Sequence, residues 1–265
     1  MQLRMTVNNN KIKALPLRFF KRALLKLFKL SKGVTHVDTA ILSLPTGTTC
    51  PGARECLTFS DRVTGRITDG PESELRCFAA SMQAMSPEAR AMAWHNFDIM
   101  RRVKCPVAMG ELIHNSLPRT ERVRLFRFDA AGDLFNQTYF DGLMLAAQRN
   151  PHMLFYGYTK SIKFWLDYLK RFTRLPVNVH LVASMGGTCD ALAIEHGLRR
   201  AIVVDTPEAA ARLRVPIDHD DSHVWNYRGS FALLVHGTQR KGSKRALAVK
   251  LLKARGIKFS YGKSK

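Results

Sequence analysis

A short apolar run leads into a loop rich in glycine and cysteine over Thr39-Ala-Ile-Leu-Ser-Leu-Pro-Thr-Gly-Thr-Thr-Cys-Pro-Gly-Ala-Arg-Glu-Cys56. Residues 39–44 are mostly apolar or β-branched, which favours a strand, and Pro45 and Gly47 end it. Sites in α/β proteins gather in the loops at the carboxyl ends of parallel strands. The loop over 45–56 is therefore a candidate site if the rest of the chain builds a parallel sheet.

The rest of the chain repeats this pattern of strand, polar loop and helix. Further strands are predicted at 123–128, 153–158, 179–184, 201–204 and 231–236. Helices are predicted at 86–102, 137–149, 162–172, 190–196 and 207–213. Six strands that alternate with helices predict an α/β fold with a parallel sheet, which either stays open or curls into a partial or complete barrel.

The charge of the chain is concentrated at its two ends. The 265 residues include 42 Lys and Arg against 21 Asp and Glu, a formal charge of +21. Residues 1–33 hold nine basic and no acidic residues, and 239–265 hold ten basic and no acidic residues. The body over 34–238 carries a net charge of only +2. These differences predict a basic N-terminal extension, an α/β body and a basic C-terminal extension.

Composition narrows the class of protein further. A hydrophobic fraction of 46% argues against a chain that is disordered throughout. The chain has no run of about 18 uncharged apolar residues, so a membrane-spanning helix is not expected. No secretory leader is evident, and five cysteines do not suggest a disulfide scaffold, so we expect a cytoplasmic protein.

Each basic end is predicted to contain a helix. Residues 15–30 are amphipathic, with Phe20, Leu24, Leu27 and Phe28 on one stripe and basic side chains opposite. Such a helix either packs its apolar stripe on the body or binds nucleic acid, anionic lipid or another acidic partner. A second basic helix is predicted over 244–255, followed by a short strand over 257–261. The expected partner of these ends is nucleic acid or another polyanion, although a solvated basic face also explains them.

Three cysteines, Cys50, Cys56 and Cys77, lie in one polar region. Thiolates are soft ligands that suit iron–sulfur clusters or zinc. Three thiolates can hold three irons of a cubane cluster and leave the fourth iron open. Zinc would need a fourth ligand, for which the candidates are His95, His114 and Cys189. Three unlinked, reduced cysteines explain the spacing equally well. Cys105 and Cys189 are interpreted as buried small apolar residues.

The loops beside the other strands carry further candidate groups. Candidate catalytic residues are Lys160, His219, Asp221 and His236, and candidate cofactor-binding residues are Gly132, Asp133, Gly186 and Gly187. The segment 218–223 holds five ionisable side chains, which can bind a cation or pair an acid with a base, or can form a solvated turn. Lys160 is equally compatible with a surface position, and His236 with a core histidine. Gly186 and Gly187 would let the backbone approach a ligand.

Several of these segments resemble a known family. The run Cys50-Pro-Gly-Ala-Arg-Glu-Cys56, followed by Cys77-Phe-Ala-Ala, resembles the Cys-Pro-x-Ala-x-x-Cys … Cys-Tyr-Ala signature of the phage gene product 88 family. Members of that family are similar to radical S-adenosylmethionine proteins. Further matching segments follow in the same order, at 42–45, 131–135, 155–161, 183–187, 195–198, 218–223 and 236–239. The resemblance covers roughly 40–242 and leaves out the first 33 residues.

The resemblance implies a (βα)6 partial barrel with a 4Fe-4S cluster on Cys50, Cys56 and Cys77. It also implies that Gly132 and Asp133 stand where the related superfamily contacts the amino group of S-adenosylmethionine. Two features depart from the radical enzymes: the cysteine spacing, and the long interval over 57–76. The predicted function is a phage-type iron–sulfur protein that acts on nucleic acid in the host cytoplasm. The alternative is a non-catalytic nucleic-acid-binding protein with structural or metal-free cysteines.

Overall fold

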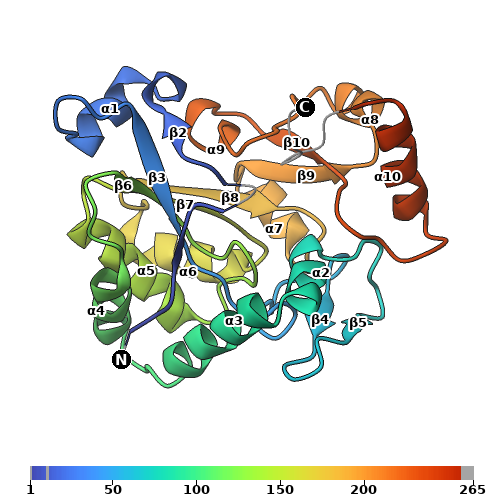
Figure 1. Cartoon of the computed structure of the whole chain (residues 1–265), viewed down its shortest axis with the longest axis horizontal. Coiled ribbons are helices and arrows are strands. Elements are labelled where there is room, and N and C mark those ends of the chain that lie inside the picture. The colour runs from blue at the N-terminus through green and yellow to red at the C-terminus, as the bar shows by residue number, and fades with distance from the viewer. Residues whose placement is uncertain (1, 10–11, 258–265) are drawn as a thin grey trace.

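A mostly parallel sheet organises the molecule (Figure 1). The computed structural model describes residues 2–9 and 12–257. Within them, six strands lie side by side in chain order, each parallel to the next: β3 (His36–Ile41), β6 (Val123–Arg127), β7 (Leu154–Thr159), β8 (Val179–Ser184), β9 (Arg200–Val204) and β10 (Phe231–Leu234). The short strands β1 (Thr6–Val7) and β2 (Leu15–Pro16) pair antiparallel with β3. The predicted α/β fold with alternating strands and helices is confirmed.

The order of the strands places the crossover helices on one face of the sheet. Each strand pairs with the next along the chain, and right-handed crossovers in a single direction all pack on the same side. On this outer face lie α4 (Pro106–Ser116), α5 (Gln137–Arg149), α6 (Ile162–Phe172) and α7 (Asp190–Glu195), packed against buried Phe126, Phe155 and Leu181. Near β9 and β10 the same face is covered by α8 (Pro207–Arg212) and α10 (Lys244–Ala254). No pairing between β10 and the β1–β3 edge closes the sheet within the described residues.

The opposite, inner face is covered by the N-terminal segment near the amino ends of the strands. Phe20 and Phe28 pack with Trp225 against the sheet; the Phe20 and Trp225 rings stack at 5.6 Å. Phe28 belongs to α1 (Arg22–Phe28), and Trp225 belongs to the short helix α9 (His223–Asn226). The apolar stripe of the basic helix therefore packs on the body, while its basic side chains face outward.

The predicted helix over 15–30 is shorter in the structure. Leu15–Pro16 form strand β2 against β3, and Leu17–Phe19 form a 3₁₀ turn before α1 begins at Arg22. Pro16 has no N–H group, so it sits at an edge of the sheet where a missing donor costs little. The predicted short strand over 257–261 lies outside the described residues, apart from Ile257.

Between the first two parallel strands, the chain forms three elements that its sequence pattern does not predict. These are the hairpin β4 (Thr58–Ser60) and β5 (Ile67–Asp69), followed by α2 (Phe78–Met85). The predicted helix α3 follows over Pro87–Met100; Ala89 N donates to the cap oxygen Ser86 Oγ at 3.2 Å. Among the described residues, no helix combines the length and apolar character needed to cross a membrane.

The packing of the N-terminal segment makes a stability prediction. Phe28 is fully buried, so Phe28→Ala leaves a cavity between α1 and the sheet and should cost about 3–5 kcal/mol of unfolding free energy in urea denaturation. The matched control is Phe19→Ala, because Phe19 is 39% exposed and should change stability by about 0.5 kcal/mol or less. Equal losses for the two variants would contradict the packing described for α1.

Candidate functional site

A cavity of about 210 Å³ lies on the inner face, at the carboxyl ends of the parallel strands. Its walls include Arg127 and Tyr158 from the strands and Phe78 from α2. It gathers eight of the predicted site residues: Cys50, Cys56, Cys77, Gly132, Asp133, Lys160, Asp221 and His236. The other three candidates, Gly186, Gly187 and His219, are not among the described residues that line it.

Tight turns position the first cysteine. Gly47 has a φ of 74°, and Cys50 N donates to Gly47 O at 3.2 Å. Thr49 Oγ1 donates to Pro45 O at 2.8 Å, which winds the loop back on the end of β3. Gly52 then passes so close to β7 that a Cβ atom there would lie 2.1 Å from Lys160 O. Only glycine allows this approach, so the cysteine loop is pressed onto the adjoining strand end.

The hairpin β4–β5 explains how Cys77 returns to Cys56 despite the long interval between them. Thr58 pairs with Asp69, and Gly70 N donates to Leu57 O at 2.7 Å, closing the base of the hairpin. The N–H groups of residues 74 and 75 both donate to Glu55 O, beside Cys56. The residues between Cys56 and Cys77 therefore project as a hairpin, and the chain returns to the cavity at Cys77, beside Cys56.

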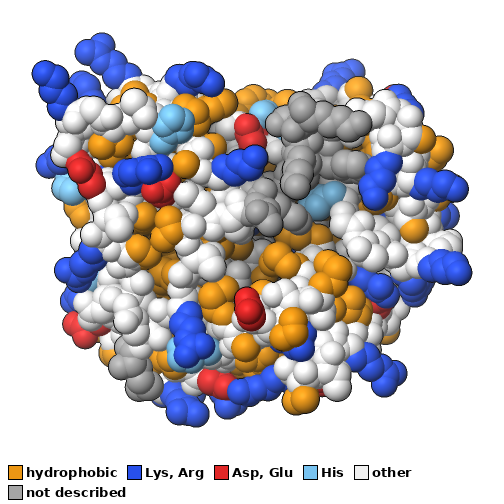
Figure 2. Space-filling model, in the orientation of Figure 1, with side chains coloured by type: hydrophobic (Ala, Val, Ile, Leu, Met, Phe, Trp, Pro, Cys, Tyr) orange, Lys and Arg blue, Asp and Glu red, His pale blue; other side chains and the backbone are white. Residues whose placement is uncertain are grey.

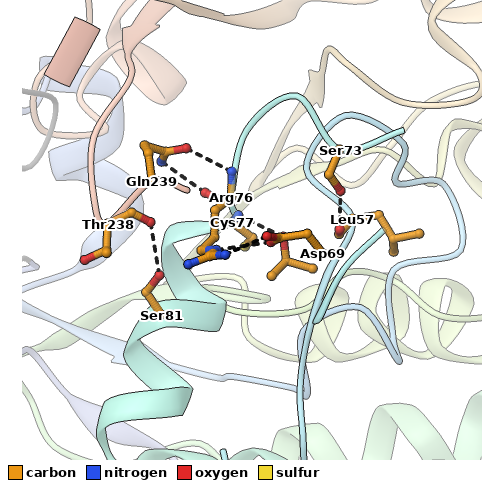
Figure 3. Close-up of polar contacts among 9 residues, drawn as sticks. Leu57, Asp69, Ser73, Arg76, Cys77, Ser81, Thr238 and Gln239 are labelled. Atoms are coloured by element: carbon orange, nitrogen blue, oxygen red, sulfur yellow. Dashed lines mark hydrogen bonds and ion pairs between the residues drawn. The ribbon is translucent and has the colours of Figure 1, made fainter. Parts of the chain in front are cut away.

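A network of polar contacts then holds the Cys77 segment (Figure 3). Arg76 pairs with Asp69 through Nη2–Oδ2 at 2.6 Å and Nε–Oδ1 at 3.1 Å. Gln239 accepts from Arg76 N at 2.9 Å and donates to Arg76 O at 3.2 Å. Cys77 N donates to Thr58 Oγ1 at 3.2 Å. Gln239 was noticed in the sequence only as part of a matching segment, and the structure identifies it as a residue that positions Cys77.

The three thiols are close enough to influence one another. Burial raises the pKa of Cys50 well above its usual value, and the charges of Asp133, Cys77 and Cys56 raise it further. Burial also raises the pKa of Cys56, to about 11, although Lys160 opposes the shift. The thiols of Cys50 and Cys56 are therefore neutral at pH 7 unless a bound cation compensates their charge.

The described residues contain no group of three or more His, Cys, Asp or Glu placed to hold one metal ion. An iron–sulfur cluster does not require the three cysteines to converge on one ion, because each thiolate binds a separate iron. The proposed fourth zinc ligands lie elsewhere: His95 Nε2 is 3.2 Å from Gln2 O, and His114 Nδ1 is 3.2 Å from Asn150 Oδ1. Cys189 precedes α7 and does not line the cavity.

The interpretation of Cys105 and Cys189 as buried residues is wrong. Cys105 is exposed, because it occupies the position just before α4 begins at Pro106, at an open end of the helix. Cys189 is half-buried and packs at the rim of the outer core.

Asp133 joins two strand ends. Its carboxylate accepts from Leu134 N at 2.7 Å, Thr159 Oγ1 at 2.5 Å and Lys160 N at 2.8 Å. Burial raises the pKa of Asp133, and these three hydrogen bonds oppose the rise. Most of its capacity to accept hydrogen bonds is therefore used within the protein.

Lys160 reaches in turn to the end of β8. Its ammonium donates to Ser184 O at 3.1 Å, to Ser184 Oγ at 2.9 Å and to Met185 O. Lys160 is 8% exposed, so the surface position considered for it is wrong. The side chain ties β7 to β8 at the wall of the cavity.

Asp129 is a buried residue of the cavity wall that the sequence reading did not single out. Its Oδ1 accepts from Tyr139 Oη at 2.9 Å, whereas its Oδ2 has no hydrogen-bond partner among the described residues. Burial, and then the charge of Asp133, raise the pKa of Asp129 well above its ordinary value. The available signal was its place as the first residue after the predicted strand 123–128.

The acidic segment 218–223 is divided between two environments. Asp221 lines the cavity, where Tyr158 Oη donates to its Oδ1 at 2.6 Å and Arg127 Nε lies 3.7 Å from its Oδ2. Asp218 is fully buried and lies 3.2 Å from His223 Nδ1. This segment is therefore largely packed, not a solvated turn.

Gly186 and Gly187 support the cysteine loop from behind. Both N–H groups donate to the Asp190 carboxylate, at 2.8 and 2.9 Å. Gly186 O accepts from Glu55 N at 3.0 Å. The backbone at these glycines was expected to approach a ligand. It approaches the cysteine loop instead, where Ala53 forms a β-bridge with Gly187.

Gln239 provides a test of the Cys77 support. Gln239→Ala leaves a backbone N–H and a carbonyl of Arg76 without their partner and should cost about 1–3 kcal/mol in urea denaturation. Gln148→Ala, at an exposed position of α5, is the matched control and should change stability by about 0.5 kcal/mol or less. If Gln239→Ala leaves the free energy of unfolding unchanged, the role assigned to these hydrogen bonds is wrong.

Asp218 provides a pH test. Burial, and then the charge of Asp221, raise its pKa to about 8, so the folded protein keeps a proton that the unfolded chain loses near pH 4. The wild-type free energy of unfolding should therefore fall from about pH 4 to 8, by at most about 1.4 kcal/mol per pH unit from this group. Asp218→Asn removes the titration, so urea denaturation at pH 5 and pH 8 should show a smaller fall. An equal fall in both proteins would contradict the assignment.

Comparison with known proteins identifies the family. A family model described as gene product 88 matches residues 4–255. The match extends beyond the resemblance over 40–242 and includes most of the N-terminal segment, whose strands lie in the sheet. Comparison with curated proteins and with solved structures gave no match. Because the family model covers nearly the whole chain, this protein belongs to the gene product 88 family.

Proposed function

We propose that the protein is an iron–sulfur protein in which Cys50, Cys56 and Cys77 ligate a 4Fe-4S cluster. The observation that carries the proposal is that three cysteines from separate turns line one cavity, where the charge of Cys77 raises the pKa of both Cys50 and Cys56. The cavity also contains a buried oxygen, Asp129 Oδ2, that lacks a partner among the described residues. A cluster would compensate the charge of three thiolates that the cavity by itself disfavours.

The donor set favours a cluster over zinc. Three thiolates are a complete protein ligand set for a cubane cluster with one open iron, whereas structural zinc requires a fourth ligand. His95 and His114, the histidines considered as the fourth zinc ligand, lie outside the cavity. When bound, the cluster would supply redox-active iron with an open coordination position.

We further propose that the sheet is the (βα)6 partial barrel of the radical S-adenosylmethionine type. Six parallel strands in chain order, with their crossover helices on the outer face, support this assignment. S-adenosylmethionine would then occupy the cavity beside the cysteines, with the backbone near Gly132 at its wall. Asp133 would act indirectly, because its carboxylate already accepts three hydrogen bonds. Asp129 is the better candidate for direct contact.

Several polar groups would handle the substrate in this cavity. Asp221 is held by Tyr158 and Arg127 on the wall, and His236 lines the side formed by the loop after β10. Lys160 would fix the geometry of the strand ends through Ser184. His219 lies outside the described lining, so a role for it would be through the fold of the segment 218–223.

The proposed substrate or partner class is nucleic acid. The basic side chains of α1 remain exposed after its apolar side packs on the sheet, which supports binding of a polyanion. The same observation supports the rival function, a non-catalytic nucleic-acid-binding protein with structural or metal-free cysteines. Iron content separates the two.

Anaerobic reconstitution with iron and sulfide tests the proposal. Wild type should become brown, with about four irons per chain, and Cys50→Ala should lose most of this iron and its absorbance. The matched control is Cys105→Ala, because Cys105 is exposed and does not line the cavity; it should retain wild-type iron. A colourless wild type, or equal losses in both variants, would overturn the cluster assignment.

A further inference from the structure

A second concave surface lies at the end of the sheet opposite the cavity. It is lined by Val123, at the start of β6, and by Met153, just before β7. The same strands reach the cavity at their other ends, through Arg127 and Tyr158. At about 3.3 Å per residue, Met153 and Tyr158 are separated by about 17 Å along β7. We call this surface, together with its rim, the basal groove.

The rim of the basal groove is predominantly basic. Polar lining residues include Arg119, Arg124, Arg149, His114, His152 and Glu121. Glu121 is the one acidic side chain among the lining residues described, and its Oε1 accepts from Ser31 N at 3.1 Å. Arg119 is exposed and makes no hydrogen bond or ion pair with any described residue. Arg149 is paired with Glu111 at 3.2 Å, so Arg119 and Arg124 are the lining arginines whose charge no described carboxylate compensates.

The C-terminal end of α1 continues this basic surface. Arg124 Nε donates to Phe28 O at 2.7 Å, and His152 Nδ1 lies 3.3 Å from Leu27 O, so the helix end borders the groove. Lys29 and Lys32 follow directly and are exposed. Figure 2 shows Lys and Arg side chains projecting from the surface where α1 lies, at the upper left. The groove and the helix thus form one strongly basic surface.

The packing of α1 decides between two classes of anionic partner. A helix that binds at a lipid surface must insert its apolar face between the headgroups. In α1 and at Phe20 just before it, that face is occupied, since Phe20 and Phe28 are 5% and 0% exposed; Phe19, in the turn before the helix, is 39% exposed. The basic face remains available, and charge with a single exposed aromatic side chain beside it suits a phosphodiester backbone better than a lipid surface.

We propose that the basal groove is a docking site for the phosphate backbone of a nucleic acid. The proposal rests on the nucleic-acid partner of the proposed function, but not on the cluster. It places the docked strand at the opposite end of the sheet from the cysteines. The groove therefore anchors the nucleic acid, and the segment that it holds is not the segment that would enter the cavity.

Charge reversal tests this placement in the full-length chain. Binding of a fluorescein-labelled oligonucleotide, as single strand and as duplex, is followed by fluorescence anisotropy at several salt concentrations. Arg119→Glu combined with Lys32→Glu should weaken binding at low salt about tenfold or more. It should also reduce the slope of log K against log salt by about 2, because two phosphate contacts are lost.

The matched control is Arg66→Glu combined with Arg102→Glu, which makes the same change in charge at two exposed positions outside the groove. It should bind within about threefold of wild type. Equal weakening by both double variants would show that net charge, not the groove, drives binding and would overturn the proposal. Absence of oligonucleotide binding by wild type would also overturn the proposal. A groove variant that still binds the oligonucleotide but no longer binds anionic phosphatidylserine vesicles would overturn it as well.

Iron content keeps this test separate from that of the cluster. The groove variant should keep the iron and the thermal midpoint of wild type, because the exposed side chains at 32 and 119 contact neither cavity nor core. Absence of iron in every variant, with groove-dependent binding intact, would refute the cluster and leave the docking site standing. Normal iron content together with oligonucleotide binding that the groove substitutions do not change would refute the docking site and leave the cluster standing.

Discussion

The site depends on the buried contact between Asp133 and the end of β7. The carboxylate accepts from Thr159 and Lys160, and the Lys160 ammonium continues to Ser184 at the end of β8. Gly52 presses the cysteine loop onto the carbonyl of Lys160 from the other side. Three strand ends and the cysteine loop are thereby fixed to one another. Buried charged groups of this kind are stable only when their hydrogen bonds are satisfied, so the arrangement specifies one geometry.

The inner face of the sheet serves two purposes along its length. Near the amino ends of the strands, Phe20, Phe28 and Trp225 fill it with packed rings. Near the carboxyl ends, a few polar side chains, including Arg127, Asp129 and Asp133, join apolar ones around a cavity. Packed rings beneath the pocket exclude water from one side of the site and add to the burial that raises the pKa of Cys50, Asp129 and Asp133. The N-terminal segment is thus part of the core that supports the site.

The same packing fixes where the positive charge of the N-terminal segment lies on the molecule. Because α1 is held on the sheet, its lysines lie at fixed positions near the amino ends of the strands. In the proposed function, the cavity with the three cysteines holds cofactors at one end of the sheet, and we propose that the basal groove holds a polyanion at the other.

Local sequence patterns are sufficient to predict the alternation of six strands with helices and the place of the cysteine loop at a strand-end site. Both follow from local patterns: β-rich runs, helix caps such as Ser86, and turn-forming glycines. The tertiary structure alone decided which candidates meet. The hairpin over 58–69 brings Cys77 back to Cys56, Asp129 lies buried beside Asp133, and the two glycines at 186 and 187 turn toward the cysteine loop. These contacts join residues far apart in sequence, and no local pattern encodes the close backbone approach or the burial that creates them.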